Sequence, residues 1–139
     1  MRKRITAGIG ALALAFPTAG TAATPKRKVV TLWKQAAGPT VQVDRWGEIK
    51  VVLVIRKRIT TIGTKRTVRR RITAVRLPVW PNQGGTHTIG LNRRVMPILA
   101  QEVLREQFAT EVDIITEATD TSVGFSQSLQ VALANGRRV

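Results

Sequence analysis

The alternation of apolar and polar positions predicts strands through the first half of the chain. The expected strands cover residues 29–33, 40–46, 49–59 and 67–79. The third is the strongest, because β-branched side chains dominate it. Its Val51, Leu53 and Ile55 point to one side and its Val52 and Val54 to the other. Apolar side chains on both sides predict a central strand that is covered on both faces, at least in its first half.

The second half of the chain changes to a helical period. We expect a Gly-rich loop, a helix, a short strand and a second helix over residues 81–90, 93–108, 111–115 and 122–135. Asn92 is a candidate N-cap for the first helix, and Pro97 is compatible only with its first turn. Gly136 is a candidate C-cap for the second. The order of elements predicts an α+β fold, with an antiparallel sheet and two helices packed on it.

The N-terminal 23 residues have the order of parts found in a secretory signal peptide. Arg2, Lys3 and Arg4 precede a short apolar stretch, Pro17 breaks it, and small residues follow up to Ala23. An uncleaved membrane anchor is the alternative reading. Both predict an extracytoplasmic domain. The expected organisation is a signal peptide over residues 1–23, a linker over 24–28 and one domain over 29–139.

The charge of the chain is strongly positive, at +15. Residues 24–100 hold 17 basic and 2 acidic side chains, whereas residues 101–139 hold 3 and 6. Across the expected hairpin, the basic residues 56–58 face the arginines at 66–71, and like charges directly opposite each other cost up to about 1 kcal/mol per pair. Either this arginine-rich hairpin docks to a polyanion or an anionic surface, or its side chains spread into solvent.

Composition excludes several classes of site. The chain has no cysteine, which excludes a disulfide framework, a thiolate zinc site and a cysteine nucleophile. His87 is the single histidine, which disfavours metal sites built from several histidines. Aromatic residues are 4% of the chain, with no tyrosine, which argues against a protein that binds single-stranded nucleic acid by stacking.

The segment before the last expected helix carries the candidate chemistry. Residues 113–122 hold three threonines, a serine, Asp113, Glu117 and Asp120 at the entrance of that helix. Thr121 or Asp120 can serve as the N-cap. A threonine just ahead of the free helical N–H groups, such as Thr119, can hold a phosphate ester against them. Ordinary capping is the alternative reading.

At these residues the sequence resembles the flavinylation motif of FMN-binding domains, Asp-x-x-Ser/Thr-Gly-Ala-Thr followed by Thr-Ser and a helix. Such domains occur in the C subunit of the sodium-translocating NADH:quinone reductase, in the G subunit of the Rnf complex, and in small secreted actinobacterial proteins. The matching positions are Asp113, Thr116, Ala118, Thr119, Thr121 and Ser122. Glu117 departs from the motif, because it stands where the family has glycine; a glutamate at positive φ is costly, and its charge repels a phosphate.

The resemblance implies an FMN-binding-domain-like fold and a covalent cofactor. A flavin transferase would attach FMN to the Thr119 hydroxyl through a phosphoester. Asp113 and Thr116 would belong to the segment that the transferase recognises, and Ala118 would be a further cofactor-binding position. Thr121 and Ser122 would cap the helix and hydrogen-bond the phosphate. The tryptophans are candidates for stacking on the flavin or for core packing.

The function implied is an extracytoplasmic electron carrier rather than a complete enzyme. It would exchange electrons with a membrane or secreted redox partner. The alternative is a basic module of the same fold, without flavin, that binds an anionic envelope component or another polyanion through the arginine-rich hairpin.

Overall fold

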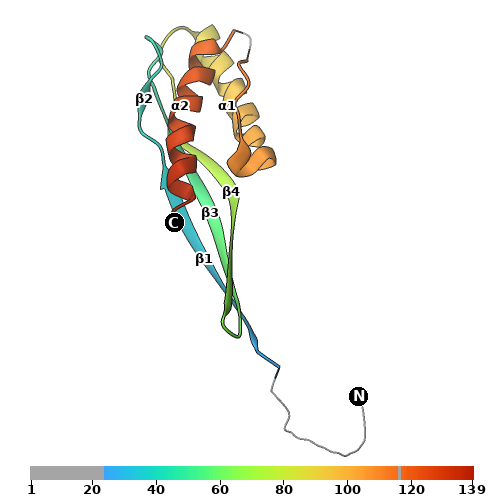
Figure 1. The fold of residues 1–139 in the computed structure, drawn as a ribbon. Helices are drawn as coiled ribbons and strands as arrows, with labels where there is room; N and C mark the ends of the chain where they lie inside the picture. Colours follow the sequence, from blue (N-terminus) through green and yellow to red (C-terminus); the bar gives the residue numbers. More distant parts are fainter. Residues whose placement is uncertain (1–23, 116) are drawn as a thin grey trace, which may run out of the picture. The chain divides into compact units, whose positions relative to one another are not determined.

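The structure is a computed structural model and describes residues 24–115 and 117–139, so the expected signal peptide and Thr116 lie outside the described residues. The strands are β1 (Arg27–Ala37), β2 (Val41–Gln42), β3 (Glu48–Ile62) and β4 (Lys65–Val79). The helices are α1 (Thr86–Glu106), the short 3-10 helix η1 (Gln107–Ala109) and α2 (Thr119–Gly136). The predicted α+β class, an antiparallel sheet with two helices, is confirmed (Figure 1).

β3 is the central strand of the sheet. β4 pairs with it, and so do β1 and β2. β2 is antiparallel to β3, with Val41 opposite Ile49. Just before β2, the Gly38 N–H donates to the Val51 carbonyl at 2.8 Å. β1 and β2 therefore follow one another along one edge of β3, with the turn at Gly38 between them. This break shortens the strand predicted over residues 40–46 to two residues.

The described residues divide into two units. The smaller unit contains residues 24–28 and 60–66, where Pro25 packs beside Gly63. The larger unit contains residues 29–59 and 67–139. It holds both helices, the core and the sites described below.

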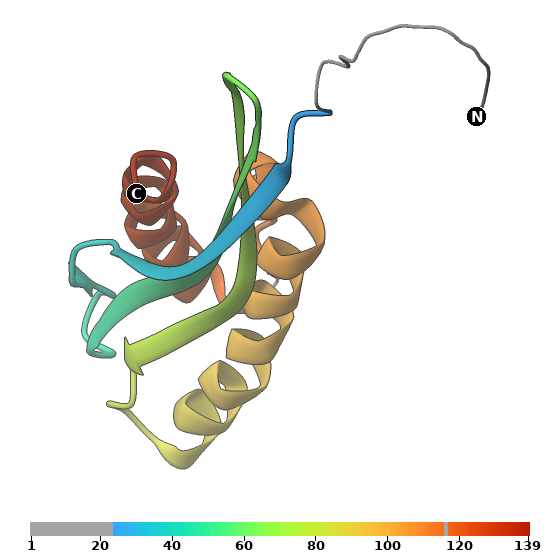
Figure 2. The same ribbon diagram turned by 90° about the horizontal axis from the view of Figure 1, so that it is seen from below.

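The core lies between the sheet and the two helices. Ile49, Val51, Leu53 and Ile55 of β3 are fully buried. They pack with side chains of α1 and α2, namely Val95, Leu99, Val103, Phe125, Leu129 and Leu133. α2 lies on the side of β1 and β2, and α1 on the side of β4 (Figures 1 and 2).

The opposite face of β3 is more open than the sequence predicted. Val52 and Val54, which alternate with the buried positions, are only half-buried. The expectation that both faces of this strand are covered is therefore wrong. Both helices pack their buried side chains on one face of the strand.

The first helix begins earlier than its apolar stripe predicted. α1 starts at Thr86, with Gly85 as its N-cap, so half of the expected Gly-rich loop is helical. Asn92 is no cap, because it lies buried inside α1. Pro97 lies in the helix interior rather than the first turn. Pro97 is on the exposed side of α1. Because proline has no N–H, the carbonyl of Arg93, four residues earlier and also exposed, has no helical donor.

The second helix is also longer than predicted, and the strand expected over residues 111–115 does not form. The N-cap of α2 is Ala118, not Asp120 or Thr121, which both lie within the helix. Gly136 is not the C-cap either. It is the last helical residue, buried where an added Cβ would be 2.7 Å from Ile55 and 3.1 Å from Phe108. None of the described helices is long and apolar enough to cross a membrane.

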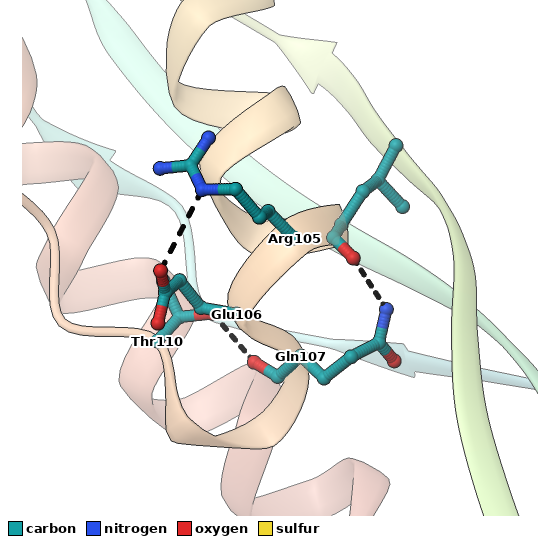
Figure 3. A network of polar contacts seen from close by, with 5 residues as sticks. Arg105, Glu106, Gln107 and Thr110 are labelled. Atoms are coloured by element: carbon teal, nitrogen blue, oxygen red, sulfur yellow. Dashed lines mark hydrogen bonds and ion pairs between the residues drawn. The ribbon is translucent and has the colours of Figure 1, made fainter.

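The Gln107 side chain joins the end of α1 to β4. Figure 3 shows Gln107 at the end of α1, together with Arg105, Glu106 and Thr110. Its Oε1 accepts from the Ile72 N–H at 2.7 Å, and its Nε2 donates to the Ile72 carbonyl at 3.1 Å. The same Nε2 also donates to the Leu104 carbonyl at 2.7 Å. Since β4 pairs with β3 through its other edge, the amide satisfies main-chain groups that would otherwise be unpaired.

Candidate functional site

A cavity of about 300 Å³ opens at the beginning of α2. Its lining comes from three parts of the chain: Trp46 before β3, the first turns of α1, and the segment that enters α2. The lining residues are Trp46, His87, Thr88, Leu91, Asn92, Glu117, Ala118, Thr119, Asp120 and Thr121. The volume is at the lower end of the roughly 300–1,000 Å³ typical of small-molecule sites.

Thr119 lies where the cavity meets the positive end of the α2 dipole. It is the first residue of the helix and is exposed. The Ser122 N–H donates to the Ala118 carbonyl at 2.9 Å, and no side chain of the N-cap residue accepts from the first turn. The N–H groups of Thr119, Asp120 and Thr121 precede that bond and have no intrahelical acceptor. These groups favour an anion beside the Thr119 hydroxyl.

Glu117 adopts a backbone conformation that favours glycine. Its φ is +72°, in the left-handed region. For a residue with a Cβ this region costs roughly 1–2 kcal/mol, whereas glycine enters it freely. The turn at this position places Ala118 and Thr119 at the start of α2. The chain therefore makes a glycine-type turn immediately before Ala-Thr, with a glutamate at the turn.

A buried hydrogen-bond network forms the inner wall of the cavity. The Thr121 hydroxyl donates to Asn92 Oδ1 at 2.7 Å, and Asn92 Nδ2 donates to the Pro81 carbonyl at 3.3 Å. The Ser122 hydroxyl donates to the Ala118 carbonyl at 2.8 Å and accepts from the Ile115 N–H at 3.2 Å. Both hydroxyl protons are thus used inside the protein, and the two side chains fix α2 against α1 and the entering segment.

Trp46 supplies an aromatic wall. Its ring lies beside Gly84, where an added Cβ would come within 2.9 Å of Trp46 Cε3. The Trp46 carbonyl accepts from the Gln83 N–H at 2.8 Å, and the Arg45 guanidinium lies 4.8 Å from the ring centroid. These contacts fix the position of the ring at the wall of the cavity.

Asp113 lies away from the cavity, beside Glu102 of α1. Burial, and then the charge of Asp113, raise the pKa of the Glu102 carboxyl above its ordinary value of 4.5. Arg105 and a backbone hydrogen bond from Asp113 act in the opposite direction. Asp113 is exposed and is not among the residues that line the cavity.

The arginines of the hairpin do not reach this site either. Arg56, Arg58, Arg69, Arg70 and Arg71 line a separate cleft of about 340 Å³. None of these arginines lines the cavity that holds Thr119. In the cavity itself, Glu117 and Asp120 are exposed carboxylates, which act against an anion, while the free N–H groups favour one.

Sequence reasoning missed the contribution of α1. Thr88 was expected in the Gly-rich loop, Leu91 was assigned to no element, and Asn92 was expected to cap a helix. One signal was present: Asn92 stands on the buried stripe of α1, three residues before Val95 and seven before Leu99. An asparagine on an apolar stripe needs buried partners, and here Thr121 and Pro81 provide them.

The arrangement combines an exposed hydroxyl, free N–H donors and an aromatic wall around one cavity. These groups fit a phosphate ester of an aromatic molecule. The negative charges of Glu117 and Asp120 act against the phosphate. A scan against protein-family models and searches of curated proteins and solved structures find no match to this chain.

Proposed function

We propose that the protein is an extracytoplasmic flavoprotein electron carrier in which FMN is covalently attached to Thr119. The observation that carries this proposal is the positive φ of Glu117, at the position where the flavinylation motif has its glycine. Ala118 and Thr119 follow that turn and open α2 at the cavity. Backbone geometry thus supports a resemblance that residue identity leaves incomplete.

Attachment would use FAD as the donor and a flavin transferase as the catalyst. The Thr119 Oγ1 forms a new bond to the phosphorus of the FMN part of FAD, the diphosphate bridge breaks, and AMP leaves. The hydroxyl proton passes to the transferase. The product is a phosphodiester with one negative charge, placed at the start of α2 where N–H groups are free. Asp113 and Thr116 belong to the segment that the transferase would recognise.

The residues of the cavity divide the task of holding the cofactor. The N–H groups of the first turn would face the phosphate, and Trp46 and Leu91 would border the flavin ring. Thr121 and Ser122 would act by fixing the start of α2, because their hydroxyl protons are already donated to protein acceptors. FMN supplies the capacity to accept and release electrons, and the protein supplies attachment and partial burial.

The proposal implies a redox partner at the membrane or outside it. A cavity whose rim residues Glu117, Thr119 and Asp120 are exposed suits a carrier, because a partner protein can approach the ring there. The signal peptide expected over residues 1–23 would deliver the domain to that compartment.

The test is intact mass after co-expression with a flavin transferase in an exporting host. We expect one added FMN and visible absorbance, both lost in Thr119→Val. Thr88→Val is the matched control, because Thr88 carries a hydroxyl in the same cavity, and it should retain both signals. An unmodified wild-type mass in the presence of an active transferase would refute attachment.

The second candidate function is a basic module of the same fold that carries no flavin. The cleft formed by Arg56, Arg58, Arg69, Arg70 and Arg71 favours it. An unmodified mass, together with anion binding that weakens steeply with salt, would support this alternative.

A further inference from the structure

The sheet has an exposed face on the side away from the helices. On β3, Ile55 is buried against α2, so Arg56 and Arg58, which alternate with it, point to the opposite side. On β4, Ile72 is buried in the same core, which places Arg69 and Arg71 on that opposite side too. We call this side, with its arginine cleft, the open face.

The open face is strongly cationic. The five residues that line the cleft are all arginines, and none of them pairs with an aspartate or glutamate in the part of the chain that the structure describes. The sequence between Glu48 and Glu102 contains no acidic residue at all. Arg70 has the parity of Ile72, on the side of the helices, and donates to the Val139 carbonyl at 2.8 Å. The others are available to an external anion.

An exposed apolar strip adjoins these charges. On β1, Ala36 is buried and lies close to Gly136 of α2, because a Cβ added to Gly136 would contact both Ala36 and Ile55. Ala36 therefore faces the helices. Trp33 has the opposite parity and therefore lies on the open face, with 62% of its surface exposed. Val29 has the same parity as Trp33 and is also exposed, whereas the exposed Val30 and Leu32 have the parity of Ala36 and lie on the other side.

We propose that the open face is a docking surface for a bilayer that contains anionic phospholipids. Guanidinium groups bind lipid phosphates in forked geometry, and tryptophan is the side chain that prefers the level of the headgroups. A bilayer presents phosphate and apolar layers side by side, which matches a cluster of arginines next to Trp33. Single-stranded nucleic acid fits less well, because it needs several stacking aromatics and the described open face offers one tryptophan.

Vesicle co-sedimentation of the full chain tests the proposal. We expect binding to mixed phosphatidylglycerol and phosphatidylcholine vesicles, loss of binding on raising salt, and none to phosphatidylcholine alone. Each arginine near an anionic surface contributes about fivefold in affinity, so Arg69→Gln with Arg71→Gln should weaken binding about 25-fold. The matched control is Arg94→Gln with Arg105→Gln, which removes the same charge from exposed positions of α1.

Trp33→Ala separates a bilayer from other anions. It should weaken vesicle binding and abolish most of the blue shift in tryptophan fluorescence on adding vesicles, while Trp33→Phe should retain part of the binding. If the control pair at Arg94 and Arg105 weakens vesicle binding as much as the pair at Arg69 and Arg71, net charge and not the open face is the cause, and the proposal is overturned. Binding to inorganic polyphosphate that exceeds vesicle binding and ignores Trp33 would overturn it in favour of another polyanion. Each variant is also measured in the Thr119→Val background, which removes the proposed flavin attachment. Vesicle binding should be the same in both backgrounds, because the open face does not depend on flavin.

Discussion

Replacing Glu117 by glycine tests the backbone argument at the candidate site. The left-handed conformation of Glu117 costs roughly 1–2 kcal/mol, and glycine removes that cost. Glycine also raises the entropy of the unfolded chain, which takes back about 0.4–1 kcal/mol. The net expectation is a stabilisation of about 0.5–1 kcal/mol, or roughly 2–5 °C in Tm for a domain of this size.

Thermal unfolding followed by circular dichroism measures the effect, and Glu117→Ala is the matched control. Alanine removes the carboxylate but keeps a Cβ at positive φ, so its Tm should stay near the wild-type value. In co-expression with a flavin transferase, Glu117→Gly should carry the larger flavin fraction of the two variants. If Glu117→Ala stabilises as much as Glu117→Gly, charge and not backbone conformation is the cause, and the reasoning fails.

Two further predictions concern packing and titration. Gly38→Ala should destabilise the fold by about 3 kcal/mol, because the added Cβ overlaps the Ser128 carbonyl oxygen and comes within 2.6 Å of its Oγ, whose hydrogen bonds hold Val51 and Pro39. Urea denaturation checks this against Gly90→Ala, which meets only ordinary contacts and should stabilise α1 by up to about 1 kcal/mol. Because the folded state raises the pKa of Glu102, this carboxyl binds its proton more tightly there, and its contribution to stability declines as pH rises above the unfolded value. Glu102→Gln should therefore stabilise the fold at neutral pH by less than about 1 kcal/mol and leave it unchanged in acid; a gain of equal size at both pH values would contradict the assignment.

The sequence was sufficient to predict the two long strands β3 and β4 and the fold class. β-branched runs and the turn at Gly63 located β3 and β4, because these residues favour strands wherever an edge is available. The same rule failed at residues 111–115, where Val112, Ile114 and Ile115 are β-branched but the segment remains without strand structure. A strand needs a partner edge, and at Ile72 the outer edge of β4 is occupied by Gln107. That contact depends on tertiary structure, which no local pattern reports.

The candidate site was predictable in part. The local run at Ala118 and Thr119 pointed to the start of a helix, and these residues do line the cavity. Trp46 and Thr88 come from distant segments, and their approach depends on how α1 packs against α2. The beginning of α1 was missed because Gly85, Thr86 and His87 have weak helix propensity, whereas burial of Asn92 and Leu99 holds the helix in place.

The Gln107 amide acts as a one-residue surrogate for a fifth strand. By satisfying both main-chain groups of Ile72, it closes that border of the sheet to addition of another chain. Because the same side chain holds the Leu104 carbonyl, fraying of β4 at Ile72 and unwinding of the last turn of α1 become a single cooperative event.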